Sequence, residues 1–219
     1  GRLAEAGVSD VIVQPLGVDL NRFHPRLADR PGLFRRLGLA PDTRLLVFAG
    51  RAAREKNIEA MIEAVERLGD PYRLLLVGAG RDARPSDQVI ALDYERDTGA
   101  LARIVASADA FLHANENEPF GLAVLEALAA GTPVIGPRRG GVGEVIDEAV
   151  GQRAQGVGAA HLAEAIEALF ARDLGLVSQS ARRRAEDQHG WNSTFEGLTD
   201  LYAGLAGDIP QPGALALSA

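Results

Sequence analysis

The stretch AFLHANENEPFGLAVLEALAAGTPVIG, from Ala110 to Gly136, decides the fold. It begins with a short apolar run that ends at His113, continues into a segment of helical periodicity over Phe120–Ala130, and closes with a second apolar run at Pro133–Gly136. Apolar runs without alternation indicate strands buried on both faces, and an intervening helix indicates parallel pairing. The stretch therefore predicts a strand–helix–strand unit of a parallel sheet.

The same alternation continues on both sides of this unit. Further apolar runs predict strands at Val11–Gln14, Leu45–Ala49, Arg73–Val77 and Val89–Leu92, and segments with helical spacing lie near Pro31–Leu37, Ile58–Leu68, Gly99–Ser107 and Gly143–Asp147. This repetition predicts an α/β fold with a doubly wound parallel sheet. In such sheets, ligands bind beyond the carboxyl ends of the strands.

Beyond Gly158 the pattern becomes helical as far as about Leu205. Apolar residues recur at helical spacing over three segments, His161–Arg172, Leu174–His189 and Ser193–Leu205, which predicts a set of C-terminal helices. The sequence thus indicates one domain over residues 1–206. A frayed tail is expected at 207–219, where prolines and glycine interrupt the pattern.

The composition limits the classes of function. The chain has 219 residues, of which 47% are hydrophobic, a net charge of −7 and a pI of about 5.2. Domains that bind nucleic acids are normally basic, so no nucleic-acid partner is expected, and the basic run Arg182–Arg184 is expected on the solvated face of its helix. The sequence has no cysteine, which fits a cytoplasmic location, and no apolar run long enough to cross a bilayer.

Two glutamates in the opening stretch have different settings. Glu118 precedes the predicted helix at a strand end, whereas Glu126 lies inside that helix among leucine, valine and alanine residues. A carboxylate in apolar surroundings needs partners, and a vicinal diol such as a ribose offers two donors. The first helical amides, from Phe120 to Leu122, favour an anion, and Gly121 permits close approach. The alternative is that Glu126 pairs with an arginine and that Glu118 merely suits the helix dipole.

The segment EPFGLAVLEALAAGTPVIGPRRGGVGEVI, from Glu118 to Ile146, resembles the signature of the retaining, nucleotide-sugar-dependent glycosyltransferases of family 4, which have the GT-B fold. Further similar segments follow in the family's order: PLGVDLNRFHP (Pro15–Pro25), FAGRAAREKNIEAMIEA (Phe48–Ala64), LLLVGAGR (Leu74–Arg81), ALARIVASADAFLHAN (Ala100–Asn115) and the closing helix with Trp191. The resemblance covers nearly the whole chain. It implies the C-terminal, Rossmann-like, donor-binding half of a two-domain enzyme, with residues 1–20 leading in from a missing N-terminal domain that binds the acceptor.

The resemblance also implies roles for individual residues. Arg51 and Lys56 would hold the donor's diphosphate and stabilise the leaving nucleoside diphosphate, Glu126 would hold the ribose, and Glu118 would contact sugar hydroxyls near the reacting carbon. Phe120, Gly121 and Leu122 would present backbone groups to the diphosphate. From the residues alone, the two cations fit a phosphate site and a solvated charge run equally well, because Arg54 and Glu55 lie beside them.

Three further residues and one segment have weaker signals. Gly141 would border the donor sugar by resemblance, with a tight turn as the alternative, and Tyr94 follows the strand that lies near the nucleobase in the family. His113 is expected to make structural hydrogen bonds. No metal site is predicted, because no second histidine or carboxylate lies at the spacing of metal ligands. At Asn115–Asn117 the sequence departs from the family, which has a small hydroxyl residue there, so no role is transferred.

The expected function is donor binding in an enzyme that transfers a hexose from a UDP- or GDP-linked sugar without cofactor or metal. The partners expected are the nucleotide sugar and the missing acceptor-binding domain, through which contact with a membrane surface would occur. The chain alone is expected to be inactive. Two alternatives stay open, namely another GT-B enzyme such as a nucleotide-sugar epimerase, and a non-catalytic interaction domain. The sequence does not name the sugar, the base, the acceptor or the linkage.

Overall fold

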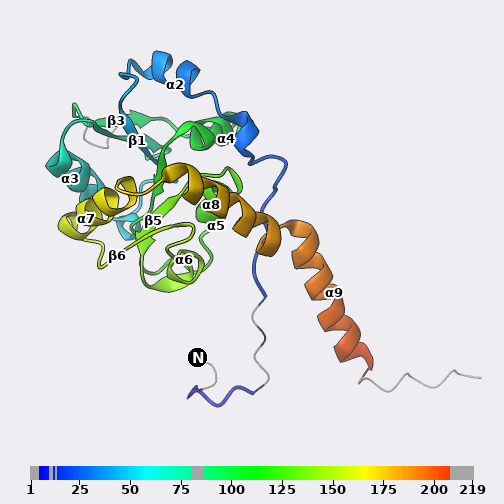
Figure 1. Cartoon of the computed structure of the whole chain (residues 1–219). Coiled ribbons are helices and arrows are strands. Elements are labelled where there is room, and N and C mark those ends of the chain that lie inside the picture. The colour runs from blue at the N-terminus through cyan, green and yellow to red at the C-terminus, as the bar shows by residue number, and fades with distance from the viewer. Residues whose placement is uncertain (1–4, 10–11, 13, 80–85, 208–219) are drawn as a thin grey trace, which may run out of the picture.

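A computed structural model describes residues 5–9, 12, 14–79 and 86–207, and the structural statements refer to these residues (Figure 1). The elements follow one another as η1 (Pro25–Leu27), α2 (Arg30–Leu37), β1 (Arg44–Ala49), η2 (Arg54–Lys56), α3 (Ile58–Leu68), β2 (Tyr72–Val77), β3 (Val89–Leu92), α4 (Thr98–Ser107), β4 (Ala110–Leu112), α5 (Leu122–Ala129), β5 (Val134–Pro137), α6 (Gly140–Val145), β6 (Gly151–Ala154), α7 (Ala159–Phe170), α8 (Leu174–Gln188) and α9 (Trp191–Gly207).

The strands of the described residues form one six-stranded sheet in the order β3-β2-β1-β4-β5-β6. Every neighbouring pair in this order is parallel. The chain builds outward from β1 to β3 and then returns to the other side of β1 with β4. The strand order therefore reverses between β1 and β4, and their carboxyl ends flank the crevice where such sheets bind ligands.

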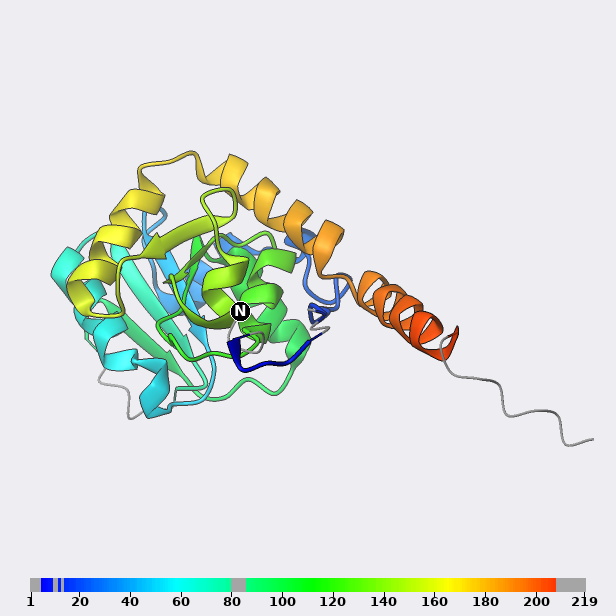
Figure 2. The same ribbon diagram turned by 90° about the horizontal axis from the view of Figure 1, so that it is seen from below.

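Helices cover both faces of the sheet, so successive residues of a central strand lie in different cores. In β1, Leu45 and Val47 belong to the core under α2, α4, α5 and α8, whereas Leu46 and Phe48 belong to the core under α3 and α7. This burial on both faces explains the unbroken apolar runs of the sequence. The helix α9 projects from this body (Figures 1 and 2). No helix among the described residues has the length and apolar character needed to cross a bilayer.

Most of the predicted elements are confirmed with shifted ends, but three predictions need comment. β6 is absent from the sequence prediction because Gln152 and Arg153 interrupt the apolar pattern, yet its backbone pairs with β5 along its length. Half of the predicted strand Val11–Gln14 falls outside the described residues, and the other half, Ile12 and Gln14, is not in a strand. The predicted tail also lies outside them, apart from Gly207, which ends α9.

The prediction that Arg182–Arg184 lie on the solvated face of their helix is wrong for two of the three residues. The Arg182 guanidinium donates to three backbone carbonyl oxygens, those of Leu20, Phe23 and Ala129. Arg184 pairs with Asp147 at 2.6 Å, while Arg183 is exposed. Arg182 thereby ties α8 to the segment before η1 and to the last residue of α5, which fixes the helix that contains Glu126.

Candidate functional site

The loops that follow β1 and β4 meet at the point where the strand order reverses. Lys56 lies at the end of the first loop and Glu118 in the second, 62 positions further along the chain, and Lys56 Nζ lies 2.5 Å from Glu118 Oε2. Both side chains are only 19% exposed. The sequence prediction assigned these residues to different parts of a ligand, and the structure joins them in an ion pair.

Glu118 has a second donor, because Asn115 Nδ2 lies 3.1 Å from the same oxygen, Oε2. Burial opposes the ionisation of Glu118, but the hydrogen bond and the charge of Lys56, together with Asn115, outweigh it and hold the pKa of this carboxyl below its usual value. Glu118 is therefore a carboxylate at neutral pH, and Lys56 neutralises it.

His113 lies close to this pair, directly after β4, with a side chain only 4% exposed. Its Nε2 is 3.9 Å from Glu118 Oε2, and neither ring nitrogen has a hydrogen-bond partner among the described residues. Burial, assisted by the Lys56 charge and opposed by Glu118, lowers the pKa of His113 to about 4, so the imidazole is neutral. The expectation that His113 makes structural hydrogen bonds is thus wrong for its side chain.

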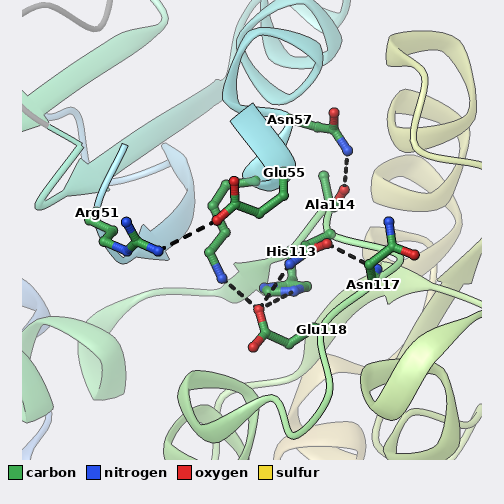
Figure 3. A network of polar contacts seen from close by, with 9 residues as sticks. Arg51, Glu55, Asn57, His113, Ala114, Asn117 and Glu118 are labelled. Atoms are coloured by element: carbon green, nitrogen blue, oxygen red, sulfur yellow. Dashed lines mark hydrogen bonds and ion pairs between the residues drawn. The ribbon is translucent and has the colours of Figure 1, made fainter. Parts of the chain in front are cut away.

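The two loops are also joined through Asn57, which sequence reasoning missed. Asn57 has a φ of 50° at the start of α3, and its Nδ2 donates to the Ala114 carbonyl oxygen at 2.7 Å (Figure 3). Asn115 was missed as well, because a departure from the family pattern transfers no role. For Asn57 the sequence did hold a signal, namely an asparagine between a basic loop and a helix. Asparagine tolerates the left-handed backbone region that this position requires.

Glu126 lies in α5, half-buried among apolar neighbours. Burial raises the pKa of Glu126 from 4.5 to about 7. Among the described residues no arginine or lysine forms an ion pair with it. The alternative in which Glu126 is neutralised by an arginine therefore finds no support in the part of the chain that the structure describes. A carboxylate of this kind is suited to accept hydrogen bonds from a ligand.

The N-terminus of α5 presents free amides at the same edge of the sheet. Gly121 precedes the helix with a φ of 68°, and a Cβ there would lie 3.0 Å from Val142 Cγ2. The amides of Val124 and Leu125 donate to the Gly121 carbonyl oxygen. The Leu122 amide lies in the first turn of α5, where the helix offers no acceptor to it. The side chains of Phe120 and Leu122 are exposed beside it.

Gly141 supports the Glu118 loop from the neighbouring helix α6. Its amide donates to the Glu118 carbonyl oxygen at 2.8 Å, and a Cβ would lie 2.4 Å from the Pro119 carbonyl oxygen. Glycine is required here because two backbones touch, which favours the structural interpretation of the glycine loop over direct contact with a sugar.

Two predicted site residues are not brought to the ion pair. Arg51 is 79% exposed and forms an ion pair with Glu55 at 3.6 Å, so its guanidinium points along its own loop (Figure 3). Tyr94, after β3, is 69% exposed, and its ring lies against Gly78. Among the described residues, no group of three or more histidine or carboxylate side chains could hold a metal ion.

Comparisons with known proteins show which family and fold the chain resembles. The D-inositol 3-phosphate glycosyltransferase of Xylanimonas cellulosilytica is 32% identical over 222 residues, which span 92% of this chain and 53% of that protein. The GDP-mannose-dependent alpha-(1-6)-phosphatidylinositol dimannoside mannosyltransferase of Mycobacterium tuberculosis is 35% identical over 189 residues, 82% of this chain and 49% of that protein. The chain thus spans about half the length of the curated relatives it matches.

The solved structure of a sucrose-phosphate synthase from Thermosynechococcus elongatus is similar with a TM-score of 0.79 and 25% identity, covering 94% of this chain and 55% of that one. This similarity confirms the predicted fold class, a doubly wound, Rossmann-like sheet with C-terminal helices. The family model described as "Glycosyl transferases group 1" matches residues 29–187. Since this match covers most of the chain and the relatives above are glycosyltransferases, the chain belongs to the glycosyl transferases group 1 family.

Proposed function

We propose that this chain is the donor-binding half of a retaining, family 4 glycosyltransferase of the GT-B fold. It binds a UDP- or GDP-linked hexose and presents the sugar to an acceptor held by a second half. Two facts support the second half: the chain spans about half of its curated relatives, and those relatives are named as glycosyltransferases. A cytoplasmic location, which the absence of cysteine from the sequence fits, and contact with a membrane surface through the other half belong to the same proposal.

The observation that carries the proposal is Glu126. A half-buried carboxylate without an ion-pair partner among the described residues lies in α5, the helix that starts at the rim of the sheet. Ionising it in these surroundings costs free energy, and two hydroxyl donors from one ribose would offset that cost. A phosphate group would not, because its negative charge would repel the carboxylate. The site therefore favours the diol of a nucleoside at Glu126.

The groups that suit a diphosphate lie at the N-terminal end of the same helix. The free amide of Leu122 and the αL residue Gly121 present backbone N–H groups, and Lys56 supplies a nearby cation. In the proposal these groups bind the diphosphate and stabilise the charge that builds up on it as the bond to the sugar breaks. Arg51, which is exposed on a loop, would reach the phosphates by turning from Glu55.

Glu118 and Tyr94 would act at opposite ends of the donor. Glu118 would accept hydrogen bonds from sugar hydroxyls close to the reacting carbon, so that it orients the sugar and stabilises positive charge there. Tyr94, beyond β3 and exposed, would offer an aromatic ring to the base. Phe120, also exposed, would cover the bound donor from the loop before α5.

Calorimetry on the full chain with UDP, GDP and ADP tests the proposal. We expect one nucleoside diphosphate to bind, and Glu126→Ala to weaken that binding about tenfold or more, because two hydrogen bonds to a charged group are lost. Glu164→Ala, on the exposed face of α7, is the matched control and should bind as the unmodified chain does. Failure of all three nucleotides to bind, or binding unchanged by Glu126→Ala, would contradict the proposal.

A further inference from the structure

Three donor groups converge on a single oxygen of Glu118. Its Oε2 lies 2.5 Å from Lys56 Nζ, 3.1 Å from Asn115 Nδ2 and 3.9 Å from His113 Nε2. These contacts all involve Oε2, and no hydrogen bond among the described residues involves Oε1. The arrangement fixes one side of the carboxylate and leaves the other oxygen available to a ligand.

If the site binds a diphosphate, as proposed above, the diphosphate competes with Glu118 for the Lys56 ammonium. A diphosphate carries about two negative charges and a carboxylate carries one, so the ammonium is drawn toward the phosphates. Glu118 would then lose its closest partner while a second anion arrives nearby. The carboxylate would be repelled from the site unless another donor held it.

Asn115 provides part of that restraint. It is 4% exposed, its Oδ1 accepts from the Asn117 amide at 2.9 Å, and its Nδ2 already donates to Glu118. The loop on which it lies is also held by the hydrogen bond from Asn57 to Ala114. Asn115 is thus anchored independently of Lys56, but a neutral amide alone replaces only a fraction of an ion pair.

His113 is the donor that remains unused. Its ring is buried, both nitrogens lack partners among the described residues, and a neutral imidazole carries one N–H. The distance of 3.9 Å to Oε2 exceeds the about 2.7–3.2 Å of a hydrogen bond, so a small rotation of either side chain closes the gap. A buried nitrogen without a partner is costly, and this movement gives Nε2 one.

We propose that His113 is a positioning residue that replaces Lys56 as the hydrogen-bond partner of Glu118 Oε2 when the bound sugar nucleotide attracts Lys56. The Nε2–H of His113 then donates to Oε2, Asn115 keeps its hydrogen bond, and Oε1 faces the sugar hydroxyls. The exchange keeps Glu118 ionised and in place in the bound state, although its cation has moved to the diphosphate.

The exchange shifts the pKa of His113 in a defined direction. The charged groups that act on this ring are Glu118, which raises its pKa, and Lys56, which lowers it. When Lys56 withdraws, the lowering influence falls away and the raising one strengthens with the new hydrogen bond. The pKa of His113 therefore rises on donor binding.

The first test measures binding of paired probes, UDP with UDP-glucose and GDP with GDP-mannose, by calorimetry on the full chain. We expect His113→Leu to lower the affinity for the sugar nucleotide about three- to tenfold relative to the matching diphosphate, whose own affinity stays within about twofold. His113→Gln, which retains a neutral N–H donor, should restore much of the ratio. His161→Leu, an exposed histidine of α7, is the control. An unchanged ratio in His113→Leu, or no rescue by glutamine, overturns the proposal.

The second test needs no nucleotide and no His113 variant that must fold normally. In Lys56→Met, the NMR signal of the His113 ring should titrate at a higher pH than in the unmodified chain, and its Nε2–H should show a new hydrogen bond. An unchanged or lowered pKa of His113 overturns the inference. The two tests separate the claims: nucleotide binding that depends on Glu126 but not on His113 overturns only this inference. A chain that binds none of the probes overturns the proposed function and the donor-driven exchange with it.

Discussion

Replacing Glu126 by glutamine should remove a pH-dependent loss of folding stability. The pKa of Glu126 is about 7 in the folded chain and 4.5 without burial. A carboxyl with a raised folded pKa costs nothing well below pH 4.5, where both the folded and the unfolded state are protonated, and its cost grows until the pH passes 7. The difference of about 2.5 between these pKa values, at about 1.4 kcal/mol for each, gives about 3 kcal/mol at pH 8 and about 1 kcal/mol at pH 5. Partial exposure makes these values upper limits.

Urea unfolding of the unmodified chain and of Glu126→Gln at pH 5, 6, 7 and 8 measures this effect. The free energy of unfolding of the variant should gain on that of the unmodified chain by about 2 kcal/mol between pH 5 and pH 8. Glutamine has a similar shape and does not ionise, so the trend with pH is more informative than the absolute difference. Glu164→Gln on α7 should show no such trend, because its side chain is exposed. A constant difference, or one that falls as the pH rises, would refute the reasoning and indicate a cation beside Glu126.

Three further predictions follow from the same geometry. The affinity for a sugar nucleotide should be about tenfold weaker at pH 6 than at pH 8, because only about a tenth of Glu126 is ionised at pH 6, and calorimetry on Glu126→Gln should lose this trend. Gly141→Ala should cost about 1–3 kcal/mol of stability and weaken nucleotide binding, because the added methyl meets a backbone carbonyl oxygen at 2.4 Å. The control Gly204→Ala in α9 meets nothing within 4 Å and should be neutral or slightly stabilising in thermal unfolding. Arg182→Ala should cost about 2–4 kcal/mol in urea unfolding, since it leaves three backbone carbonyl oxygens without their donor. The control Arg183→Ala should stay within about 0.5 kcal/mol. Equal costs would contradict the role of Arg182 in fixing α5.

The central strands could be predicted because burial on both faces leaves an unmistakable pattern. Leu45–Ala49 and Arg73–Val77 are nearly continuous apolar runs, and β1 and β2 follow them closely. β6 could not be predicted in this way, because an edge strand is held by backbone pairing and tolerates polar residues, here the partly buried Gln152 and the exposed Arg153.

Within the site, local sequence predicted which residues lie near the rim but not which of them touch. Glu126 stands out from the sequence because its neighbours along the helix are apolar, and that setting is what raises its pKa. The Lys56–Glu118 pair joins two loops 62 positions apart, and the distance between them depends on strand order rather than on local pattern. Arg182 turns inward for the same reason, because the carbonyls it bonds belong to segments far away in the sequence.

A crystal structure of the full chain with a bound nucleoside diphosphate tests the central claim most directly. The account predicts the ribose hydroxyls within hydrogen-bond distance of Glu126, the diphosphate at the Leu122 amide, and Lys56 turned from Glu118 toward the phosphates. A nucleotide bound elsewhere on the chain, or one whose ribose avoids Glu126 while Lys56 keeps its contact with Glu118, would contradict it.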